Sequence, residues 1–334
     1  MVVSVREVAE DAGVSVGTVS NVLNRPERVS AETVTRVQAS IARLGYVRND
    51  AARQLRAGRS RTIGLVVLDI RNPFFAEVVR GAEQRADEHG MSVLVANSDE
   101  SAHREGMLLD LFEEQRVAGV LITPVADALP RLQQMRDRGT LSVLVDRESR
   151  DPGFSSVAVD DVEGGRIAAA HLLESGRRRL AFVGGPVSLR QVSDRLSGAQ
   201  AVAAAAGVGL EFMATGALSV EEGRRAGRLL MERPAAERPD AVFAANDLLA
   251  LGMLQSLVMA GDARVPQDIA LIGYDDIDFA EAAVIPLSSI RQPAGLIGST
   301  AVDLLLGVSD GGTATAERVL YRPELVARAS TLGV

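Results

Sequence analysis

The 334-residue sequence contains no cysteine, tryptophan or lysine, and only 3% of its residues are aromatic. Without cysteine the chain has neither a disulfide framework nor thiolate chemistry. No uncharged apolar run reaches about 18 residues, so no segment is expected to span a membrane. Charged residues at positions 6, 7, 10 and 11 interrupt any signal-peptide core, and a cytosolic protein is therefore expected.

The remaining composition is that of a globular protein. Hydrophobic residues make up 47% of the chain and charged residues 24%, which excludes disordered and collagen-like classes. The length predicts two or three domains. The net charge of −8 argues at first against a nucleic-acid partner, but residues 1–61 carry 10 arginines and 6 acidic residues, a net of +4. The other 273 residues carry a net of −12, so the basic amino-terminal segment requires its own explanation.

That segment has the pattern of three short helices. Ser4-Val-Arg-Glu7 is a capping box, and Gly13-Val-Ser15 is a tight turn whose serine can cap a second helix over Val16–Leu23. Ser30 caps a third helix, which Gly45 ends. The spacing predicts a helix-turn-helix, whose second helix fits the DNA major groove. A generic three-helix domain is the alternative, and the local charge of +4 favours DNA.

From Thr62 onward, apolar runs alternate with helical stretches. Continuous apolar runs are typical of parallel strands buried on both faces. The expected strands are Ile63–Leu68, Val93–Ala96, Val120–Ile122, Val143–Val145, Leu180–Val183, Ala241–Ala244 and Ile269–Gly273, with helices between them such as Phe75–His89, Gly164–Ser175 and Asp247–Ala260. This alternation predicts a doubly wound α/β region of two lobes, with a crossover near residues 161–165.

Polar residues follow several of these apolar runs directly. Asp69, Asp146, Asn246 and Asp275 each stand where a strand is expected to end. Ligands of parallel α/β sheets bind beyond the carboxyl ends of the strands. Taken singly, such a residue is more often a loop cap than a ligand. Together, without a phosphate loop, these acceptors suit a neutral polyhydroxylated ligand.

An enzyme is the alternative from a different functional class. The sequence has no dinucleotide fingerprint, P-loop or HExxH motif. Residues 13–17 match the nucleophile elbow G-x-S-x-G, but a capped helix precedes them where that motif needs a strand. His89, His103 and His171 occur singly on helical faces and are expected at the surface. No catalytic residue, metal or cofactor is therefore expected.

Residues 8–24, Val-Ala-Glu-Asp-Ala-Gly-Val-Ser-Val-Gly-Thr-Val-Ser-Asn-Val-Leu-Asn, resemble the helix-turn-helix signature of the lactose-repressor/galactose-repressor (LacI/GalR) family. Further matches follow in order along the chain: Val29-Ser30, Leu44–Tyr46, Asn49–Leu55, Asn72–Phe75, Ala245–Asp247, Gly273–Asp276 and Ser289–Gln292. The resemblance implies an all-α helix-turn-helix domain over 1–47 and a hinge helix with linker over 48–60. An α/β core over 61–334 would follow, two-lobed, built on parallel sheets and similar to periplasmic sugar-binding proteins. One lobe would take about 61–160 and 291–320, the other about 161–290 and 321–334.

The same resemblance implies the DNA-contacting residues. Val16, Gly17 and Asn21 would occupy the base-reading positions of the second helix. Asn21 suits adenine, whereas the arginine that family members often carry there prefers guanine, and Gly17 offers no side chain. Candidate phosphate contacts are Thr18, Ser20, Arg25 and Arg28.

In the hinge, Asn49 opens the matching segment and Leu55 falls where a leucine wedges into the minor groove and kinks the DNA. Ala52 would pack against its counterpart in the second protomer of the dimer, and Arg53 would contact the DNA backbone. Arg48 replaces the proline that the family has before Asn49. A plain surface linker helix is the alternative.

The implied effector-binding residues are Asn72, Phe74, Phe75, Asp146, Arg147, Arg195, Asn246, Asp275 and Gln292. The Asp146-Arg147 pair would accept from and donate to sugar hydroxyls. Leu218 stands where relatives usually have an aromatic residue, and Leu189 replaces an arginine used by the purine-responsive relative, which argues against a purine. Ribose or a similar pentose is the favoured effector.

The expected function is that of a homodimeric repressor of carbohydrate-utilisation genes. It would bind near-palindromic double-stranded operator DNA under allosteric control by a small sugar held between the lobes. The alternatives are a non-regulatory sugar-binding protein and a regulator that responds to a non-sugar effector. The sequence leaves open whether the ligand releases the protein from DNA or acts as a corepressor.

Overall fold

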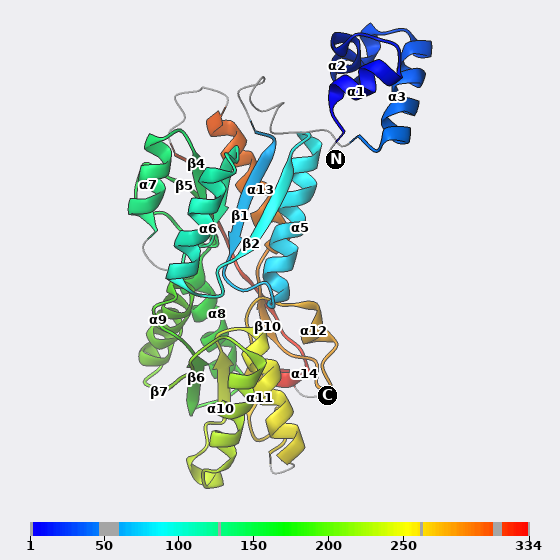
Figure 1. Ribbon diagram of the computed structural model, residues 1–334. Coiled ribbons are helices and arrows are strands. Elements are labelled where there is room, and N and C mark those ends of the chain that lie inside the picture. The colour runs from blue at the N-terminus through cyan, green and yellow to red at the C-terminus, as the bar shows by residue number, and fades with distance from the viewer. Residues whose placement is uncertain (1–2, 47–59, 126–127, 261–262, 310–315, 333–334) are drawn as a thin grey trace. The chain divides into compact units, whose positions relative to one another are not determined.

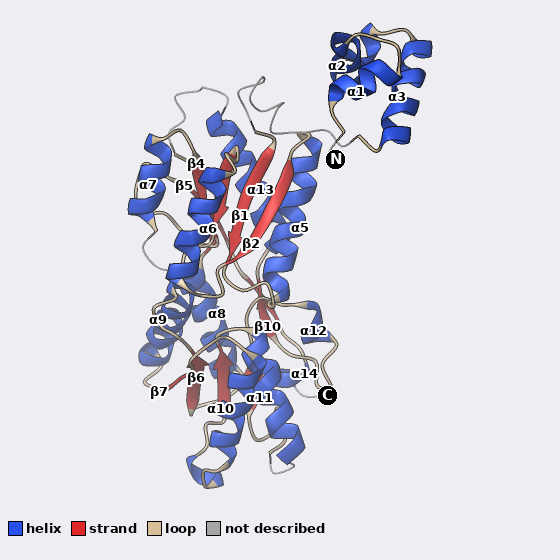
Figure 2. Cartoon of the chain, viewed as in Figure 1, coloured by secondary structure: helices blue, strands red, loops and turns tan. Residues whose placement is uncertain are grey.

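The computed structural model describes residues 3–46, 60–125, 128–260, 263–309 and 316–332. The chain forms two compact units, residues 1–60 and 61–334. Figures 1 and 2 show a small all-helical unit and a larger one that contains the sheets. The predicted hinge residues Asn49, Ala52, Arg53 and Leu55 lie outside the described residues. Within the described residues, no helix is long and apolar enough to cross a membrane.

The first unit contains helices α1 (Val5–Asp11), α2 (Val16–Asn24) and α3 (Ala31–Leu44), with a 3₁₀ turn over Pro26–Arg28. Serine side chains cap all three helices: Ser4 forms the predicted capping box with Glu7, and Ser15 and Ser30 accept from the backbone N–H groups of Thr18 and Thr33. Gly45 ends α3 with a φ of 65°, a left-handed conformation that favours glycine. The buried side chains are Val8, Ala9, Ala12, Val19, Val22 and Val37. The three predicted helices are confirmed.

The second unit begins with a six-stranded sheet of order β11-β5-β4-β3-β1-β2, in which every pair is parallel. Its strands are β1 (Thr62–Val67), β2 (Ser92–Asn97), β3 (Gly119–Ile122), β4 (Leu141–Val145), β5 (Ser155–Val159) and β11 (Arg318–Tyr321). The helices are α5 (Pro73–Glu88), α6 (Ala102–Glu114), α7 (Leu129–Asp137) and α13 (Ala294–Ser309). Leu65 belongs to the core cluster with α5 and α13, whereas Val66 belongs to the cluster with α6 and α7. Both faces of the sheet are therefore covered, and we call this half the first lobe.

The second lobe is built on a parallel sheet of order β7-β6-β8-β9. Its strands are β6 (Leu180–Gly184), β7 (Leu210–Ala214), β8 (Ala241–Ala244) and β9 (Ala270–Ile272). The helices are α8 (Asp161–Glu174), α9 (Arg190–Ala205), α10 (Val220–Met231), α11 (Asp247–Ala260), the short α12 (Asp278–Glu281) and α14 (Ala329–Leu332), with a 3₁₀ turn over Ala235–Glu237. A small antiparallel pair, β10 (Ser289–Arg291) and β12 (Glu324–Val326), lies where the chain passes between the lobes.

The predicted fold class, a helix-turn-helix unit followed by an α/β core with parallel sheets, is confirmed. All seven predicted strands are present, with ends shifted by a residue or two. One expectation was wrong: His171 is 9% exposed, because its face of α8 packs against the carboxyl-terminal segment, while His89 and His103 are exposed as predicted. The predicted bounds of the hinge and of the two lobes stay predictions.

Candidate functional site: a pocket between two lobes

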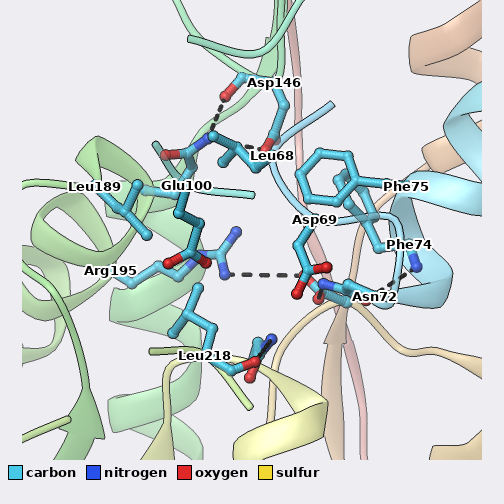
Figure 3. Close-up of a pocket in the computed structure, with 13 residues that line it drawn as sticks. Leu68, Asp69, Asn72, Phe74, Phe75, Glu100, Asp146, Leu189, Arg195 and Leu218 are labelled. Atoms are coloured by element: carbon cyan, nitrogen blue, oxygen red, sulfur yellow. Dashed lines mark hydrogen bonds and ion pairs between the residues drawn. The ribbon is translucent and has the colours of Figure 1, made fainter. Parts of the chain in front are cut away.

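A pocket with about 450 Å³ of empty space, part of it open to solvent, lies between the two lobes of the core. Its lining comes from the loops after β1, β2 and β4 and from α5 in the first lobe, and from α9 and the loops after β6, β7, β8 and β9 in the second (Figure 3). The lining residues are Leu68, Asp69, Asn72, Phe74, Phe75, Glu100, Asp146, Leu189, Gln191, Arg195, Leu218, Asn246 and Asp275.

Asp275 is the central acceptor on the second-lobe side. Its carboxylate accepts hydrogen bonds from Asn72 Nδ2 at 2.9 Å and Gln292 Nε2 at 2.7 Å, and Arg195 Nη1 lies 3.8 Å from Oδ1. The residue is 6% exposed and has a φ of 103°. Burial raises its pKa, while the positive charge of Arg195 opposes the rise. The Asn72 bond crosses the cleft from one lobe to the other.

Among the described residues, Arg195 is the only cationic side chain in the pocket lining, and it is 3% exposed. Its Nε donates to Asp161 Oδ1 at 2.7 Å, its Nη1 donates to the Ala245 carbonyl at 2.8 Å, and its guanidinium stacks 3.6 Å from the centroid of the Tyr274 ring. Burial acts to lower the pKa of Arg195, but the neighbouring carboxylates, Asp161 first, outweigh it and raise the pKa. The guanidinium is therefore charged and held rigidly against one wall of the pocket (Figure 3).

Asp146 provides a second carboxyl group, from the first lobe. Gln191 Nε2, on α9 of the second lobe, donates to Asp146 Oδ2 at 2.9 Å and to the Asp146 carbonyl at 3.0 Å. Burial, with the nearby charge of Asp161, raises the pKa of Asp146 to about 8. Because both partners of the Gln191 amide nitrogen are acceptors, the amide orientation is fixed. Gln191 Oε1 and Asp146 Oδ1 are left as buried polar atoms without a hydrogen-bond partner.

The remaining lining combines apolar faces with two acidic groups. Phe74 and Phe75 meet edge to face with centroids 5.1 Å apart, and Asn72 fixes the start of their helix by accepting from the Phe74 N–H at 3.0 Å. Glu100 lies at the rim, where burial, and after it the charge of Asp69, raises its pKa. Glu100, like Asp146 and Asp275, has a positive φ. Backbone in this costly region often marks binding sites.

Seven of the nine sequence-predicted effector residues line the pocket: Asn72, Phe74, Phe75, Asp146, Arg195, Asn246 and Asp275. Gln292 lies behind it and orients Asp275, whereas Arg147 lines a neighbouring cavity. Sequence reasoning did not identify Gln191, Glu100 or Asp161. Gln191 and Asp161 lie in the first turns of helices, and no local pattern marks them as facing a ligand.

In the first unit, the predicted DNA-reading residues share one side of α2. Val16, Gly17 and Asn21 are exposed and Ser20 is half-buried, whereas Val19 and Val22 on the other side belong to the core. Thr18 is half-buried, and its hydroxyl oxygen lies 2.9 Å from the hydroxyl oxygen of Ser15. Arg25 and Arg28, just after the helix, are exposed. This side of α2 is thus available for contact with a groove of DNA.

A helix-turn-helix unit joined to a two-lobed α/β core with a polar pocket defines the class of ligand-responsive DNA-binding regulators. Comparison with known proteins agrees with this class. Residues 4–49 match the family described as bacterial regulatory proteins, lacI family, and residues 169–331 match the periplasmic binding protein-like domain. The ribose operon repressor of Escherichia coli (strain K12) is 33% identical over 330 residues, which cover 98% of this chain and 99% of the relative.

Solved structures agree in fold. The Lac repressor dimer bound to operator and the anti-inducer ONPF matches with a TM-score of 0.85 and 29% identity, covering 99% of this chain and 100% of that one. A LacI-family regulator from Enterococcus faecium with bound ribose matches with a TM-score of 0.74 and 27% identity, covering 82% and 99%. The chain belongs to the lacI family of bacterial regulatory proteins. It is a transcriptional repressor of that family rather than an enzyme.

Proposed function

We propose that the protein is a homodimeric, cytoplasmic repressor of carbohydrate-utilisation genes whose operator affinity is controlled by a small sugar, with a ribose-like pentose favoured. The observation that carries the sugar assignment is the pair of unpartnered polar atoms, Asp146 Oδ1 and Gln191 Oε1, in a pocket that also presents Asn246 and Asp275. Buried polar atoms without partners are costly, and sugar hydroxyls, which both donate and accept hydrogen bonds, can pair with them. The two phenylalanines offer an apolar face for a sugar ring.

The relatives support the same choice. The similar E. coli protein is named a ribose operon repressor, and the similar E. faecium regulator holds ribose. Leu189 lies in the pocket lining and is 2% exposed. It provides no positive charge at the position where the purine-responsive relative uses an arginine. A regulator that responds to a non-sugar effector is the alternative.

The proposed mechanism couples the lobes to the DNA-binding unit. A ligand that contacts Asp146 on one lobe and Asp275 on the other favours one lobe orientation over others. The predicted hinge over 48–60 directly precedes the core, so a change in lobe orientation would alter the pairing of the two hinges in the dimer. In the proposed complex, Leu55 wedges into the operator centre and the α2 side with Val16, Gly17 and Asn21 reads the half-sites.

Ribose binding tests the effector assignment. Isothermal titration of the full chain with ribose, a hexose and a purine should give heat with ribose. Asp275→Asn should weaken ribose affinity by about 10–100-fold, because a charge-assisted acceptor is lost in a buried site. Asp110→Asn, on the exposed face of α6, is the matched control and should bind as the parent does. Binding of the purine alone would contradict the sugar assignment.

Operator binding tests the regulatory half of the proposal. A near-palindromic duplex selected from a randomised pool should bind the full chain at a stated salt concentration, and ribose should change that affinity. Asp275→Asn should bind the duplex but respond only at higher ribose concentrations. Ribose binding that leaves operator affinity unchanged would show that the protein binds sugar without regulating through it.

A further inference from the structure

The pocket between the lobes has more acidic side chains than basic ones in its lining. Four carboxyl groups line it, those of Asp69, Glu100, Asp146 and Asp275, and the described lining contains one cation, Arg195. One positive and four negative side chains give the lining a formal charge of −3. A neutral sugar needs hydrogen-bond acceptors but no net charge, so this excess requires a separate explanation.

The charge of Arg195 is already shared with carboxylates of the second lobe. Its Nε donates to Asp161 Oδ1 at 2.7 Å, and its Nη1 lies 3.8 Å from Asp275 Oδ1. Asp161 is buried and is not part of the lining, so it adds a further carboxyl group close to the pocket. The guanidinium therefore compensates the second-lobe side and leaves little positive charge for an anionic ligand.

On the first-lobe side, Glu100 lacks such compensation. It is half-buried in the loop after β2, and among the described residues it forms no ion pair. Arg71 pairs instead with Asp69, through Nε at 2.8 Å, and with Asp99, through Nη2 at 3.3 Å. Burial, and after it the charge of Asp69, raises the pKa of Glu100, and Arg71 opposes the rise only in part. Glu100 thus places an uncompensated carboxyl group at the pocket rim.

Two buried polar atoms in the same lining mark where a ligand lies. Asp146 Oδ1 and Gln191 Oε1 have no hydrogen-bond partner, and the two residues are 4% and 5% exposed. Figure 3 shows Asp146, Glu100 and Arg195 around the same space. An empty space of about 450 Å³ is roughly 10 Å across when compact, comparable to the screening length in 0.1 M salt. A charge on the ligand therefore interacts with Glu100 wherever in the pocket it lies.

We propose that Glu100 is a specificity-determining residue that restricts the effector to uncharged sugars and rejects anionic ones. This inference rests on the proposed sugar-responsive function and adds selection by charge. A neutral sugar uses the carboxylates as acceptors for its hydroxyl groups, whereas an anionic sugar brings another negative charge into a lining that already carries −3. A phosphorylated sugar is rejected for the same reason. The protein therefore responds to a sugar before any phosphoryl transfer to it.

Pairs of sugars that differ in charge but little in size test this selection. Riburonate has a carboxylate in place of the C5 hydroxymethyl group of ribose, and glucuronate has one in place of the C6 hydroxymethyl group of glucose. Isothermal titration of the full chain with both pairs gives the ratio of neutral to anionic affinity. We expect the parent to prefer the neutral member about tenfold or more. Ribose 5-phosphate should likewise bind more weakly than ribose.

Charge substitutions at Glu100 separate repulsion from shape. Glu100→Gln, which is nearly the same size, should reduce the preference about tenfold, and Glu100→Lys should reduce it further. A loss of packing alone would weaken both members of a pair and leave their ratio unchanged. Glu114→Gln, at an exposed position on α6 of the same lobe, makes the same change in net charge. It is the matched control, and its ratio should equal that of the parent.

The outcomes distinguish this proposal from the proposed function. If the glucose pair binds and the ribose pair does not, the pentose assignment fails, and the glucose ratio still decides the role of Glu100. The charge proposal is overturned if the parent binds the anionic member of a pair as well as the neutral one. It is also overturned if Glu100→Gln and Glu100→Lys bind the neutral sugar with the ratio of the parent. A parent that binds none of these sugars overturns both proposals.

Discussion

At the scale of single residues, His171 illustrates how one buried polar group ties down a chain end. Its Nε2 lies 2.7 Å from the Thr331 hydroxyl oxygen, which in turn lies 2.7 Å from the Ser288 hydroxyl oxygen. The Ser288 hydroxyl also donates to the Arg328 carbonyl at 3.1 Å and accepts from the Arg328 N–H at 2.8 Å. This chain of hydrogen bonds holds α14 against the second lobe.

The burial of His171 predicts a pH dependence of stability. Burial lowers its pKa, and the charge of Glu174 opposes this only partly. The folded state therefore favours the neutral ring, while the unfolded chain takes up a proton near pH 6.5. The contribution of His171 is complete above about pH 6.5 and decreases as the pH falls below it. Urea unfolding at pH 8 and at pH 5.5 should show this loss.

Substitution of the histidine checks the assignment. His171→Asn should cost about 1–3 kcal/mol at pH 8, because a buried hydroxyl loses its partner, and should reduce the loss between pH 8 and pH 5.5. His89→Asn, at an exposed position, should leave both quantities as in the parent. An unchanged pH dependence in His171→Asn would show that other groups cause it.

Some site residues could be predicted from the sequence because strand ends are local features. Asp146, Asn246 and Asp275 each follow an apolar run, and the sheet edge brings them to the pocket. Gln191 and Glu100 could not be identified in this way. Their role depends on which side chains the other lobe or a neighbouring loop places opposite them, and no sequence spacing encodes that arrangement.

At the scale of elements, helix pairs in both lobes pack through glycines. A Cβ atom at Gly298 of α13 would overlap the Val78 carbonyl of α5, and a Cβ atom at Gly165 of α8 would overlap the Arg195 carbonyl of α9. The second contact fixes the helix that carries the pocket arginine. Close backbone approach therefore positions the site as well as the core.

Gly298→Ala should destabilise the core by about 1–3 kcal/mol, because the added methyl group must displace the backbone of α5. Gly307 in the same helix has no atom within 4 Å of a Cβ position. Gly307→Ala should therefore stabilise by about 0.5–1 kcal/mol through helix propensity alone. Urea unfolding measures both. Equal effects of the two substitutions would refute the packing argument.

Sequence patterns did not predict five of the described strands, β5, β7, β10, β11 and β12, and for four of them the cause is physical. β7 is a sheet edge with Glu211 and Phe212 exposed, so its apolar run is broken. β10 and β12 have three residues each, too short for any periodicity. β5 is fully buried but begins with two serines, and their hydroxyls bond to backbone N–H groups of neighbouring segments. Such strands are specified by their neighbours rather than by their own composition.

At the scale of the whole core, two pairs of described residues are hydrogen-bonded across the cleft. Asn72 of the first lobe donates to Asp275 of the second at 2.9 Å, and Gln191 of the second donates to Asp146 of the first at 2.9 Å. The core thus contains its own contacts that favour closure. A sugar that enters must replace or add to these bonds, so their strength helps set the affinity for the effector.

Removal of one crossing residue pair should open the core. Gln191→Ala removes both bonds from its amide nitrogen to Asp146 and should increase the ratio of open to closed molecules about fivefold or more, because each net hydrogen bond contributes about 1 kcal/mol. Gln133→Ala is the control, since the bond from its side-chain amide to Asp137 lies within α7 of one lobe.

Because the chain has no cysteine, Arg104→Cys on α6 and Glu221→Cys on α10 provide two unique sites for fluorescent labels, one on each lobe. Energy transfer between the labels, measured with excess unlabelled chain to suppress transfer between protomers, reports the distance across the cleft. Gln191→Ala should shift the distribution to longer distances without ligand, and ribose should restore part of the short-distance population. Identical distributions in Gln191→Ala, Gln133→Ala and the parent would show that this bond does not hold the lobes together.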